Sequence, residues 1–231
     1  MSFHPANLRS SGGADRRINV LAPWHPDCKD SCVQTLCGHG GTVICIHLAC
    51  GSLFSCSTDG YVFVWGKQEG RDMLMFPWYA IHHRINFAEK ASAVTDTAWI
   101  NSIRYNEQMR GGELYCCDAS GKIWTVAAHL QPDGKMKMGK EPKAWPKAHN
   151  LGARTSLTHC SLRHCLTVLA GIVGSECVAV EGALYTVSND LTFRQHDVAS
   201  GACRRTLSAT GKAKFSAVFL QSFCNRFHEY D

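Results

Sequence analysis

The chain has 231 residues with a formal net charge of +5, and 45% of its residues are hydrophobic. This length suffices for one large all-β domain or two small ones, and the composition argues against a chain that is disordered throughout. The first residues lack the apolar core of a secretory signal, and the longest apolar stretch falls short of the roughly 18 residues that a membrane-spanning helix requires. We therefore expect a soluble cytoplasmic protein, with the nucleus as an alternative location.

The sequence contains 13 cysteines, which lie scattered among strand-like runs. An odd number cannot pair completely within one chain, so we expect reduced thiols in a reducing compartment. One segment brings cysteine and histidine together at compact spacing, namely His25, Cys28, Cys32, Cys37 and His39. Structural zinc sites favour Cys-x-x-Cys pairs in two halves, and the second half is missing here. No metal or cofactor site is predicted.

Short strands follow one another along most of the chain. Residues 1–29 are polar and are typical of a tail or a lead-in strand. From Cys32 onward, apolar or β-branched runs alternate with turns rich in Gly, Asp, Asn and Ser, and sustained helical periodicity is hard to find. The opening stretch predicts the strands CVQTL, VICIHL, SLFSCS and YVFVW, with a fifth at MLMF. The pattern indicates an all-β fold.

The same strand unit recurs further along the chain. The stretch from Ala183 to Leu207 repeats the order of strand, serine and aspartate turn, strand and closing strand. A weaker copy runs from Glu113 to Val126, with Val126 where the first unit has Trp65. Recurrence of one β-unit predicts a repeat architecture.

The first unit, TLCGHGGTVICIHLACGSLFSCSTDGYVFVW, resembles a WD repeat, the four-stranded blade of a β-propeller. The later stretch SNDLTFRQHDVASGACRRTL is similar to the second half of such a repeat together with its outer strand. The resemblance implies a WD-repeat propeller over residues 30–222, with about three blades and the start of another at Phe215 to Leu220. Insertions are expected at about 77–93 and 131–159, because the repeats lie farther apart than usual. A tail is expected at residues 223–231.

WD repeats carry a buried hydrogen-bond chain across the blade, made by a histidine, a Ser or Thr, a turn aspartate and a tryptophan. The resemblance assigns these roles to His39, Ser57, Asp59 and Trp65. In such a chain the carboxylate accepts from the imidazole, and the hydroxyl bonds the imidazole and the indole N–H. His39 is therefore interpreted as a structural residue and not as a catalytic base.

The later copies depart from the family pattern. In the last copy Leu191, His196 and Ile172 stand where a turn glycine, a tryptophan and the Gly-His pair are usual, so its polar chain is predicted to be incomplete. The middle copy lacks an obvious combination of histidine, turn aspartate and tryptophan. We expect the middle blade to depend more on apolar packing.

Catalytic motifs are missing from the sequence. A Ser-His-Asp hydrolase of the nucleophile-elbow type needs Gly-x-Ser-x-Gly, which does not occur. The pair Gly211 and Lys212 lacks the glycine spacing and the following hydroxyl residue of a phosphate-binding loop. No catalytic residue is predicted, and an enzyme is the third-ranked hypothesis.

An unfinished propeller has a physical consequence. An open array of blades leaves apolar faces and unpaired strand edges in water. The insertions could conceal degenerate strands of a fourth blade, but we favour completion by a partner, by a second copy of the chain or by sequence beyond Asp231. We expect the purified chain to elute as an oligomer or aggregate.

The leading functional hypothesis is a non-enzymatic scaffold that binds other proteins within a larger intracellular assembly. The family pattern places the docking surface at Gly41, Thr42, Thr58 and Asn189. A second candidate is an aromatic group that either anchors a partner or fills the gap between two blades, made of Phe76, Trp78 and Tyr79. The alternative is an RNA-associated subunit of ribosome assembly or RNA processing, using the basic stretch from Lys135 to Lys147, where Glu141 is the only acid.

Overall fold

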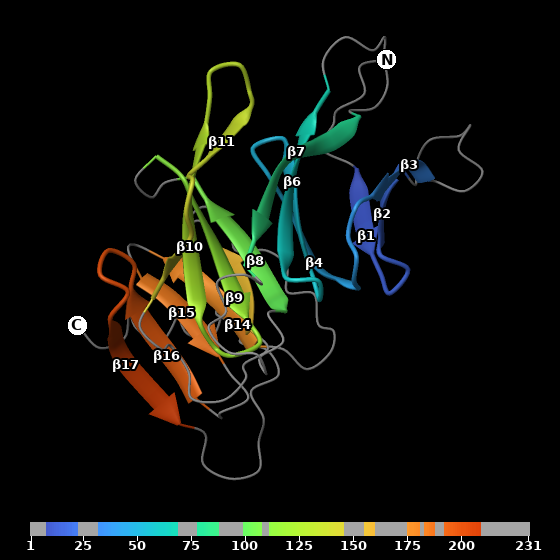
Figure 1. Ribbon diagram of the computed structural model, residues 1–231. Helices are drawn as coiled ribbons and strands as arrows, with labels where there is room; N and C mark the ends of the chain where they lie inside the picture. The colour runs from blue at the N-terminus through green and yellow to red at the C-terminus, as the bar shows by residue number, and fades with distance from the viewer. Residues whose placement is uncertain are drawn as a thin grey trace.

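The computed structural model describes residues 8–22, 32–68, 78–87, 99–107, 111–145, 155–159, 175–180, 183–187 and 192–208. The regular elements in these ranges are all β-strands. Within them, no helix is long and apolar enough to cross a membrane. The strands form four sheets that follow one another in chain order, from blue to orange-red in Figure 1.

The first sheet consists of three antiparallel strands, β1 (Arg9–Gly12), β2 (Arg17–Leu21) and β3 (Cys32–Cys37). Part of the expected polar tail thus forms a β-hairpin, and β3 pairs with β2. The strand predicted at CVQTL is confirmed as β3, but it belongs to this sheet and not to the sheet of the next predicted strands. Leu36 of β3 lies opposite Ile18 of β2, and the two side chains form a buried apolar face of this sheet. A glycine-rich loop after β3 leads to the next sheet.

The second sheet is the first blade, a four-stranded antiparallel meander of β4 (Val43–Ala49), β5 (Ser52–Ser57), β6 (Tyr61–Lys67) and β7 (Tyr79–Asn86). Strand β7 lies within the insertion expected at 77–93 and is instead the outer strand of the blade. The sequence did not reveal it because His82 and Arg84 interrupt its apolar pattern on a partly exposed outer strand. The strand predicted at MLMF lies outside the described residues.

The third sheet, or middle blade, contains β8 (Ile100–Asn106), β9 (Glu113–Asp118) and β10 (Ile123–Leu130). Two short strands, β11 (Met136–Met138) and β12 (Lys143–Ala144), pair with β10 at its outer edge. The first part of the insertion expected at 131–159 therefore completes this blade. The sequence did not reveal β11 and β12, because strands of three and two residues are too short to show an alternation of apolar and polar residues.

The fourth sheet, or last blade, is an antiparallel meander of β14 (Ser175–Val180), β15 (Ala183–Val187), β16 (Thr192–Asp197) and β17 (Cys203–Ser208). A fifth strand, β13 (Thr155–His159), adds to β14 in parallel. The further blade expected to start at Phe215 to Leu220 lies outside the described residues, as does the tail expected at 223–231.

Apolar clusters separate successive sheets. One lies between the first sheet and the first blade and includes Ile18, Val20 and Phe63. The largest lies between the first and middle blades and includes Phe54, Ile103 and Trp124. A third joins the middle and last blades through Tyr115, Ile123 and Leu184. Each inner sheet is thus covered by apolar packing on both faces, as the blades of a propeller are.

The row is open at the first sheet, and its outward face is polar. The side chains on that face are exposed at Arg9, Ser11, Arg17 and Thr35, and Thr35 Oγ1 donates a hydrogen bond of 3.0 Å to Asn19 Oδ1. The expectation that an open array exposes apolar blade faces is wrong for this face. At the opposite end of the row, Leu207 on β17 is 51% exposed.

Candidate functional site

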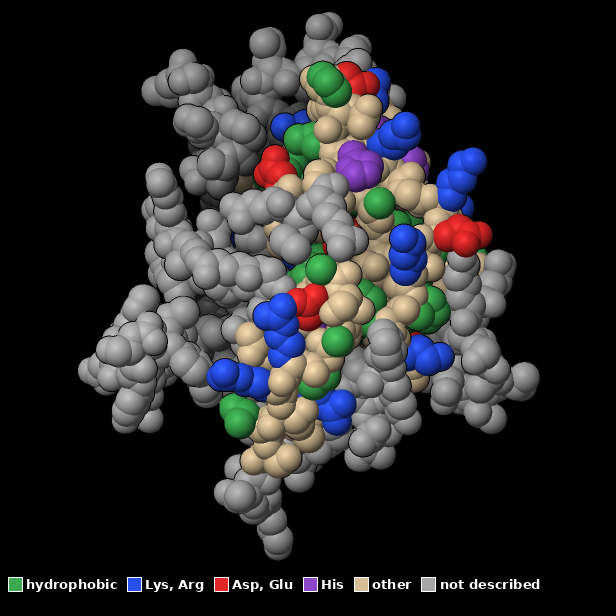
Figure 2. Space-filling view, turned by 90° about the vertical axis from the view of Figure 1, so that its left-hand side faces the viewer, with side chains coloured by type: hydrophobic (Ala, Val, Ile, Leu, Met, Phe, Trp, Pro, Cys, Tyr) green, Lys and Arg blue, Asp and Glu red, His purple; other side chains and the backbone are tan. Residues whose placement is uncertain are grey.

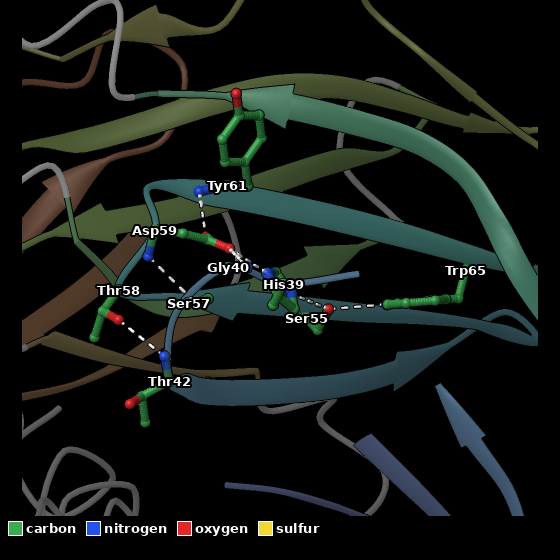
Figure 3. Close-up of polar contacts among 9 residues, drawn as sticks. All are labelled: His39, Gly40, Thr42, Ser55, Ser57, Thr58, Asp59, Tyr61 and Trp65. Atoms are coloured by element: carbon green, nitrogen blue, oxygen red, sulfur yellow. Dashed lines mark hydrogen bonds and ion pairs between the residues drawn. The ribbon is translucent and has the colours of Figure 1, made fainter. Parts of the chain in front are cut away.

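A chain of hydrogen bonds crosses the first blade on the face toward the first sheet (Figure 3). His39 Nδ1 lies 3.0 Å from Asp59 Oδ2, and His39 Nε2 lies 2.8 Å from Ser55 Oγ. Trp65 Nε1 donates to the same Ser55 Oγ at 2.8 Å. His39 and Trp65 are buried, and the His39 ring stacks on Phe63 with 4.2 Å between ring centroids.

Chemistry fixes the direction of these bonds. An indole N–H can only donate and an ionised carboxylate can only accept. His39 Nδ1 therefore carries the proton toward Asp59, and the Ser55 hydroxyl oxygen accepts from the Trp65 indole and also bonds His39 Nε2. Every buried polar atom along the chain then has a partner, which stabilises the blade.

Asp59 also holds the turn between β5 and β6. Its Oδ2 accepts from the backbone N–H of Gly40 at 2.7 Å, and its Oδ1 accepts from that of Tyr61 at 2.9 Å. Burial acts to raise the pKa of Asp59, but hydrogen bonds from His39, Tyr61 and Gly40 outweigh it and lower the pKa to about 2. The carboxylate is thus charged and links two loops.

The hydroxyl residue of the hydrogen-bond chain is Ser55, so the prediction that assigned this role to Ser57 is wrong. Ser57 is buried two positions further along β5, where its Oγ accepts from the Asp59 backbone N–H at 3.2 Å. Both serines lie on the same face, because side chains alternate along a strand. Trp65 lies opposite Leu53, so Ser55 is its diagonal neighbour on this face, whereas Ser57 lies two positions farther away.

Ser55, His39 and Asp59 have the connectivity of a serine hydrolase triad. However, Ser55 is fully buried at 0% exposure, and its Oγ already receives the Trp65 indole N–H. A substrate carbonyl would have to reach this oxygen through the packed interior between two sheets. The arrangement therefore supports architecture and offers no nucleophile to a substrate.

The middle blade has a polar link of its own. Asp118 Oδ2 accepts from Trp124 Nε1 at 2.9 Å, and Asp118 Oδ1 accepts from the backbone N–H groups of Ser120 and Lys122, both at 2.9 Å. The Ser120 hydroxyl donates to Oδ1 as well. The expectation that this blade depends mainly on apolar packing missed this link. A tryptophan and an aspartate were present in the sequence, but each stands two positions before the place that the family pattern gives it.

Among its described residues, the last blade has a bond that corresponds to part of this hydrogen-bond chain. Thr186 Oγ1 lies 3.0 Å from His196 Nε2, and both side chains are buried. The strand registers place Thr186 where the first blade has Ser55, and His196 where it has Trp65. Leu191 and Ile172, on which the prediction of an incomplete chain also depended, lie outside the described residues.

The docking surface predicted at Gly41, Thr42 and Thr58 is one compact loop pair. Thr42 N–H donates to Thr58 Oγ1 at 2.9 Å, and Thr58 N–H donates to Thr42 O at 3.0 Å. A Cβ at Gly41 would collide with Thr58 Oγ1, so only glycine permits this approach. All three residues are half-buried, whereas the adjoining Gly40 is exposed. Asn189 lies outside the described residues.

The aromatic candidates do not form one surface. Tyr79 is buried in the cluster between the first sheet and the first blade, and burial raises its pKa. Its backbone N–H and C=O bond the side-chain amide of Gln34 at 3.0 and 2.8 Å, so the tyrosine is a core residue and not a partner anchor. Trp78 is half-buried, and Phe76 lies outside the described residues.

The basic stretch follows the outer edge of the middle blade. Lys135, Lys137, Lys140 and Lys143 are exposed, and Lys147 lies outside the described residues. Lys135 Nζ lies 3.9 Å from Asp133 Oδ2. On the face shown in Figure 2, the Lys and Arg side chains are scattered among other side chains and do not form one continuous patch.

No group of three or more His, Cys, Asp or Glu side chains within the described ranges could hold a metal ion. Of the compact cysteine and histidine segment, His25 and Cys28 lie outside these ranges. His39 is occupied on both ring nitrogens. Cys32 and Cys37 are exposed free thiols at the two ends of β3.

Comparisons with known proteins identify the fold. No protein-family model and no curated protein matches the chain in sequence. Among solved structures, the chain is similar to the WD40 β-propeller domain of Doa1, with a TM-score of 0.57 and 18% sequence identity. The alignment covers 90% of this chain and 53% of that one, so the chain spans about half the length of the solved propeller domain. The fold is therefore an all-β propeller with an incomplete ring of blades.

Proposed function

We propose that this chain is a non-enzymatic scaffold for protein–protein interaction, which acts as a subunit of a larger cytoplasmic assembly. The proposal is based on one observation: the polar side chains that could serve in catalysis are already hydrogen-bonded to one another. His39, Asp59 and Ser55 resemble catalytic groups, but each is bonded within the blade. The loop surface at the end of this blade includes the exposed Gly40, and propellers of this kind bind other proteins at such surfaces.

The Gly40 to Thr42 loop and Thr58 form the docking surface in this proposal. The loop donates backbone hydrogen bonds to the side chains of Asp59 and Thr58, so it presents a preorganised backbone to a partner. Because this surface needs no induced change, a partner binds it with little ordering cost. The partner class is another protein, which includes a second propeller fragment or a second copy of the chain.

Gly40→Arg tests this surface without disturbing the fold. A Cβ at Gly40 meets nothing closer than Asp59 at 3.9 Å, and Gly40 does not have a left-handed backbone. The matched control is Ser11→Arg on the exposed outer face of the first sheet. We expect quantitative affinity isolation to recover the same proteins with the wild type and Ser11→Arg, and to lose them with Gly40→Arg at an unchanged melting temperature. Equal recovery with all three chains would refute this docking surface.

The second candidate function is association with RNA as part of ribosome assembly or RNA processing. It is favoured by four described lysines that are exposed along one edge. Contacts to single-stranded RNA phosphates would make the logarithm of affinity fall with the logarithm of salt by about 0.7 per contact. Replacing all five lysines by glutamine should then abolish RNA retention. Unchanged retention after this replacement removes the candidate.

A further inference from the structure

Three cysteine side chains meet in the interior between the first and middle blades. Cys45 on β4 and Cys56 on β5 belong to the first blade, and Cys116 on β9 belongs to the middle blade. All three are free thiols. Neither the hydrogen-bond chain nor the docking surface uses them.

Cys45 and Cys56 lie directly opposite each other in the antiparallel pair of β4 and β5. Residues opposite each other in such a pair have Cα atoms about 4.5 to 5.5 Å apart. A disulfide requires a Cα separation of roughly 4.4 to 6.8 Å. The two thiols can therefore be joined with little movement of the backbone.

A cation lies beside this pair. Arg104 Nη1 lies 3.7 Å from Cys45 Sγ and is held in place by a hydrogen bond of 2.9 Å to Ile103 O. The titratable groups that face Cys45 are Arg104 from β8, Cys56 from β5 and Cys116 from β9. A guanidinium disfavours a bound metal cation at these sulfurs and favours a thiolate.

The two thiols differ in acidity. The hydrogen bond from the Cys56 thiol, together with Arg104, lowers the pKa of Cys45 to about 6 although burial opposes the shift. Burial raises the pKa of both Cys56 and Cys116. Cys45 is also partly exposed, whereas Cys56 and Cys116 are fully buried. One thiolate, on a half-buried residue, thus stands next to one neutral thiol.

We propose that Cys45 and Cys56 form a site of oxidative modification that reacts with peroxides, with Cys45 as the attacking thiolate and Cys56 as the resolving thiol. The Cys45 sulfur attacks one peroxide oxygen, the O–O bond breaks, and water or an alcohol leaves after protonation, which gives a sulfenic acid. The Cys56 thiol then attacks the Cys45 sulfur, its proton goes to the departing hydroxide as water, and the disulfide forms. A thiol reductant cleaves the disulfide and returns both cysteines to thiols, while the reductant is itself oxidised to a disulfide.

The product has a defined structural effect. The disulfide links β4 and β5 of the blade that carries the docking loop, and it removes the negative charge that Arg104 faces. Oxidation therefore changes the interior between the first and middle blades without touching the His39 chain on the opposite face of the first blade.

The direct test is peptide mapping of the full-length chain after treatment with hydrogen peroxide and alkylation of the remaining thiols. We expect a peptide pair linked through Cys45 and Cys56, with a mass 2 Da below the sum of the two reduced peptides, that disappears on reduction. A map in which Cys32 and Cys37 oxidise while Cys45 and Cys56 remain alkylatable overturns the proposal. A link from Cys45 to Cys116 overturns the assignment of Cys56.

The Cys56→Ser variant separates the two steps. Without the resolving thiol, a sulfenic acid should persist at Cys45 and be trapped by dimedone. The matched control is Cys117→Ser, which alters the buried thiol next to Cys116 on the opposite face of β9. This control should still form the Cys45 to Cys56 link. Absence of dimedone labelling at Cys45 in a folded Cys56→Ser chain contradicts the mechanism.

A rate ratio tests the role of Arg104 independently of accessibility. An ordinary thiol of pKa about 8.5 alkylates about fifty times faster at pH 8.5 than at pH 6.5. For Cys45 we expect less than about a twofold change, because its thiolate is already the main form at the lower pH. Arg104→Gln should increase the ratio. A ratio near fifty for wild-type Cys45 overturns the proposal.

Discussion

The first and middle blades use different residues for the same task. In the first blade, Asp59 reaches Trp65 through His39 and Ser55, whereas in the middle blade Asp118 bonds Trp124 directly. Both links lie on the face toward the preceding sheet. The difference teaches that two arrangements of side chains can give the same result, a turn carboxylate that is hydrogen-bonded and a buried indole N–H that has an acceptor.

Strand register explains how the middle blade achieves this link. Trp124 lies opposite Cys116 just as Phe63 lies opposite Ser55, so the tryptophan stands two positions earlier than Trp65 does. Asp118 correspondingly stands where the first blade has Ser57. Moving both partners by two positions keeps both on the same face and brings the carboxylate within direct reach of the indole.

The largest expected effect is that of Asp118→Ala. The change removes the acceptor for four donors, including the buried Trp124 indole, so we expect a loss of about 3 to 5 kcal/mol in the free energy of unfolding. Trp124→Phe removes only one donor and should cost about 1 to 2 kcal/mol. Urea unfolding of the three chains checks this order. A loss below about 1 kcal/mol for Asp118→Ala would show that the middle blade depends on apolar packing alone.

The comparison of the two serines gives the next largest effect. Ser55→Ala leaves both the Trp65 indole and His39 Nε2 without a partner, and we expect it to cost about 2 to 3 kcal/mol. Ser57→Ala removes one acceptor for the Asp59 backbone N–H and should cost about 1 kcal/mol. The two variants delete the same atom from one strand face, so each controls the other. Equal losses of stability in thermal melts would mean that Ser57 belongs to the hydrogen-bond chain after all.

Acid should weaken the first blade through Asp59. Its folded pKa of about 2 lies below the ordinary value of 3.8, so the carboxylate stabilises the fold above about pH 4, and this contribution disappears as the pH falls toward 2. The shift corresponds to about 2 kcal/mol. Asp59→Asn lacks this titration, so the difference in stability between the two chains should shrink over this range. A constant difference from pH 5 to pH 2 contradicts the assignment.

The sequence predicted the strand-rich fold and most of the hydrogen-bond chain because both leave local signals. The Gly-His pair, the Asp-Gly turn and the tryptophan stand at positions that the repeat pattern defines, and the turn glycine Gly60 has the positive φ of 78° that such a turn requires. The choice between Ser55 and Ser57 could not be made this way. It depends on which serine is the nearer diagonal neighbour of Trp65 on the adjacent strand, and register is a property of the folded sheet.

Other features depend on contacts between sheets and leave no local signal. In the sequence alone, Gln34 resembles an ordinary polar residue of a strand, and Tyr79 resembles a surface aromatic residue beside Trp78. In the structure, the Gln34 amide bonds both backbone groups of Tyr79, which lies 45 residues away. The same limit applies to Cys45 and Arg104, whose proximity arises only when β4 and β8 pack together.

The bond between Gln34 and Tyr79 gives the smallest expected effect, and it tests how firmly the first sheet is attached to the first blade. Gln34→Ala leaves the Tyr79 backbone N–H and C=O without these partners, but both are close enough to the edge for water to replace part of the loss, so we expect about 1 kcal/mol. The control is Thr35→Ala, one position along on the exposed outer face, which should change stability by less than about 0.5 kcal/mol. Hydrogen exchange at the Tyr79 amide distinguishes local from global loosening. If Gln34→Ala loosens the attachment of the first sheet locally, as we expect, exchange at Tyr79 should accelerate more than at amides of β9, whereas a uniform acceleration would mean that the first sheet and the blades unfold only together.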